Sequence, residues 1–423
     1  MPLKVIVVGA GIAGLCAAVA LRQAGHSVEI YEKSKFAAEI GAALSLSPNG
    51  VCVLRSLGFS FEKARARQMM VWESVDGTTL KQLSRLDFEH AEEEYGAPFM
   101  AVHRVDLHKE LLRLALQDGN GKGKGLEPAT LELGAPVVNL STEEGIVELE
   151  DGSKHKADLI VAADGLHSVV RSVALKQEAK PSSSGLSAFR FLVSTDRLKG
   201  DPSLSNLLEW KAPGVTILAD MSDTVNERHA VWYDCQGGEV QNFVGIHPTH
   251  SGVDGVQSRI AAEVKESMLQ EFSHFHPDIL KIFRLSEEVK CWPLFIHDPI
   301  PNWGYGKVLL IGDAAHPMLP FGGQGSNQAI EDGGALGYLL QGVENAAAVP
   351  ARLALFDKVR RNRASRVQTL SKVRSGREKE IEQELQRYAD IADSTVPGSF
   401  PERISHDFGF NVLGRCEEVL VHA

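Results

Sequence analysis

Hydrophobic and polar positions follow two different patterns along this chain. Towards both ends, short runs are apolar at nearly every position: Leu3–Val8, Val28–Tyr31, Ala157–Ala162 and Val308–Ile311. Strands of this kind are buried on both faces, which is typical of a parallel sheet covered by helices. Matching helical patterns run over Ile12–Ala24, Ser326–Gln341 and Pro350–Val373. The first two strands and the helix between them form a βαβ unit of about thirty residues.

The middle of the chain is organised differently. Strand-like segments follow one another from Leu186 to His247, at Phe189–Val193, Val215–Leu218, His229–Tyr233 and Asn242–Ile246. A hairpin is also expected from Met69 to Leu83, with its turn at Asp76-Gly77. Because βαβ-type segments flank these strands on both sides, the sequence predicts a discontinuous α/β domain with an inserted, mostly antiparallel sheet.

Composition and charge exclude several classes of protein. The formal net charge is −11, so a basic surface that would bind a nucleic acid is not expected. The five cysteines are scattered and form no C-x-x-C pair, so neither a disulfide framework nor a metal site is expected. No apolar run approaches the ~20 residues of a membrane span, and no signal peptide precedes the first strand. We therefore expect a cytoplasmic protein.

The first candidate for chemistry is Gly9-Ala10-Gly11-Ile12-Ala13-Gly14, between a strand and a helix. Gly9 permits the tight turn, Gly11 lets the backbone approach a pyrophosphate, and Gly14 brings the helix close to the strand. An acid at the end of the second strand, Glu32, can accept both ribose hydroxyls of an adenosine. The motif does not separate FAD from NAD. The predicted cofactor contacts in this unit are Gly9, Gly11, Ala13, Gly14, Glu32 and Lys33.

Two further motifs each follow a buried strand. Asp164-Gly165 ends the run that begins at Asp158, and Gly312-Asp313 follows the run that ends at Ile311. A glycine-rich stretch over Gly322–Gly325 then leads into the helix that begins at Ser326. Turn residues alone would not predict three such motifs in this order.

In this order the motifs resemble those of the single-component, group A FAD-dependent aromatic monooxygenases, which have the para-hydroxybenzoate hydroxylase fold. The chain is most similar in pattern to the salicylate hydroxylase-like members, from Met1 to about Arg374. The resemblance implies non-covalent FAD, with Asp164 and Asp313 in the second and third fingerprints and Asp313 on the ribityl hydroxyls. It also implies that the backbone near Gly325 lies against the isoalloxazine. The positive end of the helix at Ser326 would then face the flavin N1–O2 edge.

Two shorter stretches extend the resemblance. Ile40–Leu44 is similar to the loop that passes the flavin, with Ala43 where the family often has glycine. His103–Leu107 resembles the stretch whose arginine, here Arg104, contacts FAD. A surface salt bridge is the alternative for Arg104. Asp106 is expected to cap the helix that follows.

The resemblance also implies the domain organisation. The fold class is α/β, with a Rossmann-like FAD-binding domain, an inserted mostly antiparallel β-sheet domain for the substrate, and a helical C-terminal part. The FAD-binding domain is expected at residues 1–69, 98–178 and 288–375, and the substrate-binding domain at residues 70–97 and 179–287. A C-terminal helix and tail are expected at residues 376–423.

Two residues of the predicted sheet are candidates for catalysis. Arg190 is a charge between two phenylalanines, and Tyr233 lies on a second strand. In relatives that hydroxylate phenols, an arginine and a tyrosine at matching places hold the substrate phenolate over the flavin. An arginine lowers the pKa of a phenol by stabilising its anion. The alternatives are an Arg190 paired with an acid and a Tyr233 buried in the core with a satisfied hydroxyl.

The activity implied by the resemblance needs three small partners. NAD(P)H reduces bound FAD, O2 adds to give a flavin hydroperoxide at C4a, and its distal oxygen is transferred to an aromatic substrate. No second glycine-rich βαβ unit occurs, as expected where NAD(P)H binds transiently in a shared cleft. The chain is expected to be a monomer or a homodimer. A flavin epoxidase, an oxidative dearomatising enzyme acting on a non-phenolic substrate and a reductase-only flavoprotein remain as alternatives.

Overall fold

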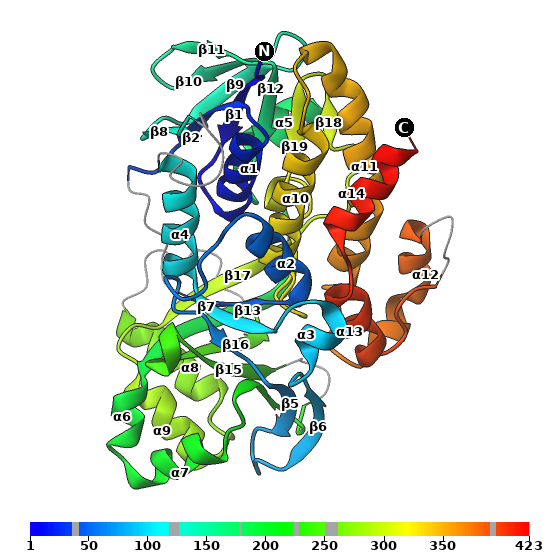
Figure 1. Cartoon of the computed structure of the whole chain (residues 1–423). Helices are drawn as coiled ribbons and strands as arrows, with labels where there is room; N and C mark the ends of the chain where they lie inside the picture. Colours follow the sequence, from blue (N-terminus) through cyan, green and yellow to red (C-terminus); the bar gives the residue numbers. More distant parts are fainter. Residues whose placement is uncertain are drawn as a thin grey trace.

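A computed structural model describes residues 1–35, 42–117, 127–176, 180–223, 228–249, 261–389 and 395–422. Ile40 and Gly41, from the expected flavin loop, lie outside these ranges. The first sheet, at the top of Figure 1, has the order β18-β19-β12-β1-β2-β8. Its strands are β1 (Lys4–Val8), β2 (Ser27–Glu32), β8 (Thr130–Leu133), β12 (Leu159–Ala162), β18 (Gly304–Tyr305) and β19 (Val308–Leu310). All its strand pairs except β18–β19 are parallel, which confirms the Rossmann-like part of the predicted fold.

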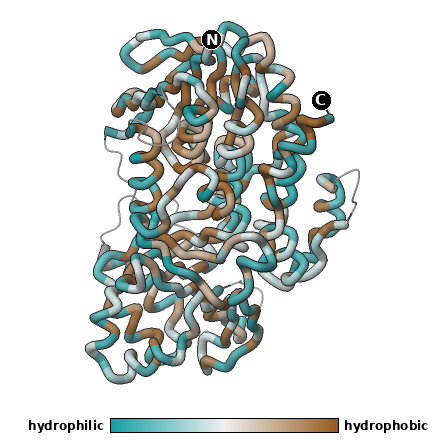
Figure 2. The backbone as a smooth tube through the Cα atoms, in the orientation of Figure 1, coloured by the Kyte–Doolittle hydropathy of each residue, from teal (hydrophilic) through white to brown (hydrophobic). Residues whose placement is uncertain are grey.

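Two helices pack closely beside this sheet because small residues meet between them. They are α1 (Ile12–Gln23) and α10 (Gly325–Leu340). A Cβ added at Gly337 would lie only 2.4 Å from the Cβ of Ala20, so α10 can approach α1 this closely only with glycine there. The apolar strands and the inner sides of these helices form the largest core cluster of the described chain. In Figure 2 the hydrophobic positions of this half lie mainly on its inner strands and helices.

The second sheet is the inserted, mostly antiparallel one, with the order β17-β13-β16-β15-β14-β5-β6. Its strands are β5 (Val71–Asp76), β6 (Gln82–Asp87), β13 (Ser182–Ser194), β14 (Gly214–Ala219), β15 (His229–Cys235), β16 (Val240–Pro248) and β17 (Lys290–Ile296). Only β14 and β5 pair in parallel. The position of β17 differs from expectation, because it lies within the range 288–375 predicted for the FAD-binding domain yet pairs with β13.

The two faces of the second sheet have different partners. Phe189 and Phe191 point to a core that includes Phe272 and Phe283. Four helices lie on that side in Figure 1: α6 (Thr195–Lys199), α7 (Pro202–Trp210), α8 (Ala261–Glu271) and α9 (Pro277–Leu285). Because side chains alternate along a strand, Arg190 points to the opposite face, towards the first sheet.

Two smaller sheets and four helices complete the two halves. A three-stranded sheet with the order β3-β7-β4 consists of β3 (Ala43–Leu46), β4 (Arg67–Gln68) and β7 (Met100–His103). A second small sheet consists of β9 (Val137–Ser141), β10 (Ile146–Leu149) and β11 (Lys154–Lys156). The accompanying helices are α2 (Pro48–Ser56), α3 (Ala91–Tyr95), α4 (Arg104–Leu116) and α5 (Val169–Leu175). The helix α4 begins at Arg104 rather than after Asp106, whose carboxylate accepts a hydrogen bond from Gln236 at 3.0 Å.

The C-terminal part is helical, as predicted, and returns to the first half. It contains α11 (Val349–Leu370), α12 (Glu382–Leu385), α13 (Phe400–Phe408) and α14 (Val412–Val421). Val412, Cys416 and Val419 of α14 belong to the same core as α1 and α10. None of the helices in the described ranges is long and apolar enough to cross a membrane.

Candidate active site

The three sequence motifs meet at the carboxyl ends of adjacent parallel strands. Val8 pairs with Tyr31 on one side and with Ala162 on the other, and Ala162 also pairs with Leu310. Four neighbouring strands therefore end at one edge of the sheet, and there they present the Gly9 loop, Glu32, Asp164 and Asp313. In open α/β sheets, ligands bind at this edge.

The glycines of the first loop differ in what surrounds them. A Cβ at Gly9, whose φ is +101°, would lie 2.5 Å from the Ala163 carbonyl oxygen, and one at Gly14 would lie 2.0 Å from the Gly9 carbonyl oxygen. At these two positions any residue larger than glycine would clash with the neighbouring backbone. A Cβ at Gly11 would meet nothing within 4 Å, so the space beside it is open for a ligand. Glu32 accepts the Ala10 N–H at 2.8 Å and the Ser34 N–H at 2.8 Å, while Lys33 is exposed.

Asp164 organises the second motif. Its carboxylate accepts the Ser168 hydroxyl at 2.6 Å and the Val170 N–H at 3.2 Å, and burial raises its pKa despite these hydrogen bonds. Arg171 then links this motif to the third. Its guanidinium, 1% exposed, donates to the Leu166 carbonyl at 2.7 Å and to the Ala314 carbonyl at 3.1 Å. This role of Arg171 was not predicted from the sequence, although its position one helical turn after Ser168 was a signal.

Asp313 is the acidic residue of the third motif. Its side chain is open to solvent, yet the surrounding protein raises the pKa of the carboxyl by desolvation. His316, Arg104 and Arg171 are near enough to oppose this rise. The structure thus brings Arg104, at the start of α4, close enough to Asp313 for their charges to interact, while its contact with FAD stays a prediction. A carboxylate that is accessible but closely surrounded suits a ligand with hydroxyl groups.

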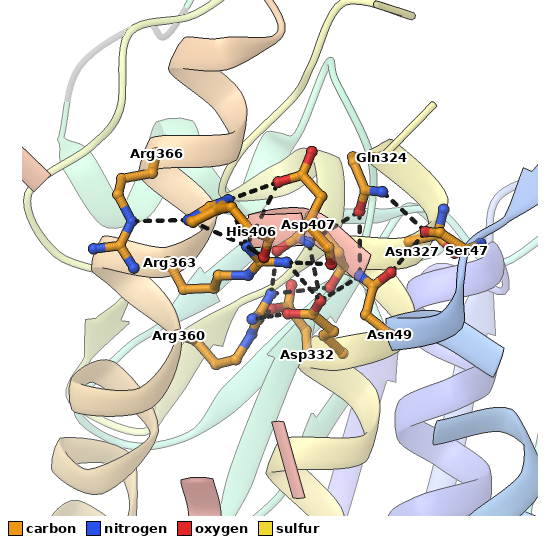
Figure 3. Close-up of polar contacts among 12 residues, drawn as sticks. Ser47, Asn49, Gln324, Asn327, Asp332, Arg360, Arg363, Arg366, His406 and Asp407 are labelled. Atoms are coloured by element: carbon orange, nitrogen blue, oxygen red, sulfur yellow. Dashed lines mark hydrogen bonds and ion pairs between the residues drawn. The ribbon is translucent and has the colours of Figure 1, made fainter. Parts of the chain in front are cut away.

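A buried polar network supports the loop that precedes α10 (Figure 3). Asn327 donates to the Gly323 carbonyl at 2.9 Å and to the Ser45 carbonyl at 3.1 Å, which ties the glycine-rich loop to β3. Asp332 accepts the Gly312 N–H at 2.8 Å and pairs with His316 at 2.6 Å. Burial alone would raise the pKa of Asp332, but His316 and Arg360 outweigh it and hold this pKa below its usual range.

The start of α10 itself stays open. A Cβ at Gly325 would meet nothing within 4 Å, and both Gly325 and Ser326 are partly exposed. The first N–H groups of a helix have no partners within the helix and carry its positive dipole end. An electron-rich edge of a ligand is favoured at this position.

The C-terminal part supports the same loop from behind. Arg403 of α13, 1% exposed, donates to the Phe321 carbonyl at 2.6 Å and to the Val373 carbonyl at 3.1 Å. Gly322 has a φ of +89°, and a Cβ there would lie 2.5 Å from this guanidinium. No sequence motif indicated this contact, because it joins residues about eighty positions apart.

Tyr233 and Asn242 hold the loop that leads into β3. They are paired neighbours on β15 and β16. The Tyr233 hydroxyl donates to the Ala43 carbonyl at 2.7 Å, and the Asn242 amide oxygen accepts the Ala43 N–H at 3.1 Å. Burial raises the pKa of Tyr233 far above its usual range. The hydroxyl is therefore a neutral donor to backbone here, and its predicted contact with a substrate stays a prediction.

Arg190 faces the same space from the neighbouring strand. In the described part of the chain its guanidinium makes no hydrogen bond or ion pair, and its Nε is buried without a partner. The guanidinium lies beside the ring of Trp292, with 5.9 Å from Cζ to the ring centroid. Desolvation lowers the pKa of Arg190; Tyr233 opposes this effect and Arg104 adds to it. The residues Arg190, Tyr233, Arg104 and Asp313 thus lie around one region between the two sheets.

Comparison with known proteins decides the family. Residues 2–371 match the family model described as FAD binding domain. This chain is an FAD-dependent monooxygenase. It is 34% identical over 396 residues to the FAD-dependent monooxygenase phomE' of Diaporthe leptostromiformis, covering 92% of this chain and 96% of the relative. It is 33% identical over 370 residues to hispidin-3-hydroxylase of Neonothopanus nambi, covering 86% of each.

The fold of this monooxygenase is also that of solved relatives. A salicylate hydroxylase in complex with its substrate matches with a TM-score of 0.73 at 24% identity, over 98% of this chain and 97% of that one. This likeness confirms the predicted fold class. The sites described above fit FAD: open space beside Gly11 for a pyrophosphate, an accessible carboxylate at Asp313 for ribityl hydroxyls, and an open helix end at Gly325 for the ring.

Proposed function

We propose that this monooxygenase uses NAD(P)H and O2 to hydroxylate a small phenolic compound, with FAD bound non-covalently. The observation that carries the proposal is that the guanidinium of Arg190 makes no hydrogen bond or ion pair with the described residues. Arg190 is only partly exposed and its Nε is buried without a hydrogen-bond partner, so its guanidinium is desolvated with no anionic partner to offset the cost. A phenolate oxygen beside Arg190 would supply both the missing charge and the missing hydrogen-bond acceptors.

An arginine at this position also suits the chemistry. Bound FAD, once reduced, supplies the activated oxygen. Arg190 would stabilise the ionised phenol, which lowers the pKa of the phenol and makes its ring more nucleophilic. The open helix end at Gly325 would favour negative charge on the flavin ring. Tyr233 and Asn242 would hold Ala43, and with it the loop beside the ring, in a fixed place.

The names of the relatives support a phenolic substrate. One relative is named a hydroxylase of hispidin, and a structural neighbour is a salicylate hydroxylase with its substrate. NAD(P)H is proposed as the reductant because the resemblance to the group A monooxygenases implies it, and the sequence contains no second glycine-rich βαβ unit to hold it separately. A nicotinamide cofactor would then have to reach the flavin transiently, through the cleft that the substrate also uses.

A substrate panel tests the proposal. Purified holoenzyme is mixed with NADPH or NADH and a set of phenols under 18O2, and both the rate of NAD(P)H oxidation and the mass of each product are measured. We expect at least one phenol to accelerate oxidation and to gain one labelled oxygen atom. Acceleration with hydrogen peroxide as the only product would favour a reductase. A labelled product from non-phenolic alkenes alone would favour an epoxidase.

A further inference from the structure

Trp292 is one of the large apolar residues that the described chain leaves exposed. It lies on β17, at the edge of the second sheet, and pairs with Ala188 of β13. The residue is 40% exposed, so part of its apolar surface is in contact with water. The indole also lies beside the guanidinium of Arg190, at 5.9 Å, within the range of a cation–π contact.

The face of the sheet that carries Trp292 packs against the loop that leads into α10. Ala188, which pairs with Trp292, packs with Leu319 and Phe321 of that loop. Paired residues of neighbouring strands place their side chains on the same face. Trp292 and Arg190 therefore border the same space between the second sheet and the loop that leads into α10.

We propose that Trp292 is a specificity-determining residue, an aromatic platform that favours phenols carrying a second planar group. This inference rests on the proposed function. A phenolate oxygen at Arg190 brings the remainder of the substrate close to the indole. A flat, unsaturated substituent can stack on the exposed ring and remove its surface from water, whereas a one-ring phenol offers less to cover it. The cation–π contact with Arg190 helps to hold the indole in this orientation.

The test compares two ligands of similar size and different shape. 4-Phenylphenol carries a flat second ring, and 4-cyclohexylphenol carries a saturated one, while phenol itself carries none. Dissociation constants for all three are measured with the holoenzyme, its Trp292→Leu variant and its Trp210→Leu variant. Trp210 is the matched control, because it is 42% exposed and lies on α7, on the other side of the sheet.

The wild type should bind 4-phenylphenol more tightly than 4-cyclohexylphenol, and Trp292→Leu should reduce this ratio roughly two- to tenfold. Trp210→Leu should leave the ratio unchanged. Binding of 4-phenylphenol should also quench tryptophan fluorescence in the wild type and in Trp210→Leu, and less in Trp292→Leu. An unchanged ratio in Trp292→Leu overturns the inference, as does an indole that responds to NADPH but to none of the phenols.

Failure of the inference is distinguishable from failure of the proposed function. If phenols bind, and Arg190→Lys weakens them all while Trp292→Leu leaves the ratio intact, only the platform is wrong. If none of the three phenols binds but other phenols of the substrate panel are hydroxylated, only the platform is wrong; if no phenol binds or reacts, the phenolic function fails and the platform fails with it.

Discussion

The Tyr233 hydroxyl donates a 2.7 Å hydrogen bond to the carbonyl oxygen of Ala43, and so joins the second sheet to the loop expected beside the flavin. Tyr233→Phe would leave this buried carbonyl without its donor, at a cost of about 1–3 kcal/mol. We expect weaker FAD binding, measured by the quenching of flavin fluorescence. Tyr305→Phe is the matched control, because that hydroxyl also donates to a carbonyl, of Asn302, but near the surface. Equal FAD affinity in wild type and Tyr233→Phe would show that the bond does not support the cofactor.

Asp313→Ala should weaken FAD binding about ten- to a hundredfold, or about 1.5–3 kcal/mol, because the ribityl hydroxyls lose a charged acceptor. The dissociation constant of FAD, measured on apoprotein, gives the result directly. Asp298→Ala removes a carboxylate that is 90% exposed and serves as the control. An unchanged FAD affinity in Asp313→Ala would mean that the Gly-Asp motif does not hold the cofactor.

The pH dependence of FAD binding should follow the same carboxyl group. Its pKa in the free protein is raised by desolvation, above the ~3.9 of an ordinary aspartate. Above the raised pKa the carboxylate accepts hydrogen bonds and FAD affinity is full. As pH falls through that pKa, the group takes up a proton and FAD affinity drops. Titrations over a range of pH should show this loss in wild type and not in Asp313→Asn, whereas the same slope in both would assign the loss to another group.

Asp332→Asn should destabilise the fold strongly, because Arg360 and Asp332 are both fully buried and paired at 2.8 Å. Removing one charge of a buried pair typically costs about 3–5 kcal/mol. The pair of Asp357 and Arg361, also on α11 but partly exposed, provides the control, and Asp357→Asn should cost less than ~1 kcal/mol. Urea unfolding of both variants measures the difference. Similar losses would mean that the network of Figure 3 contributes little to stability.

Much of this fold could be predicted from the sequence because its signals are local. The strand that ends at Val8, the turn at Gly9 and the acid at Glu32 all lie within one βαβ unit, where spacing alone places them together. The same holds for Asp164 and Asp313, since each directly follows a buried strand. Adjacent parallel strands then bring the motifs to one edge.

Contacts between distant elements could not be predicted in this way. Nothing in the spacing of residues relates Arg403 to Phe321, or Tyr233 and Asn242 to Ala43, because these contacts arise from the packing of one sheet or helix against another. The bond from Tyr233 to Ala43 also shows that the type of a residue does not by itself predict its function. Tyr233 lies in the expected region, yet its hydroxyl donates to a backbone carbonyl. The position of β17 in the second sheet could not be predicted for the same reason, since its partner β13 lies about a hundred residues earlier in the chain.

Arg190 is the residue on which the account of substrate binding rests, and the ionisation of a bound phenol tests it most directly. The absorbance of a phenol changes when it loses its proton, so its pKa can be titrated free, on the wild-type holoenzyme and on Arg190→Lys. Lysine keeps the charge but loses the planar fork of the guanidinium. We predict a bound pKa clearly below the free value in the wild type, a smaller shift in Arg190→Lys, and full FAD content in both. A phenol that binds to the wild type with its free pKa, or an equal shift in both proteins, would contradict the role of Arg190.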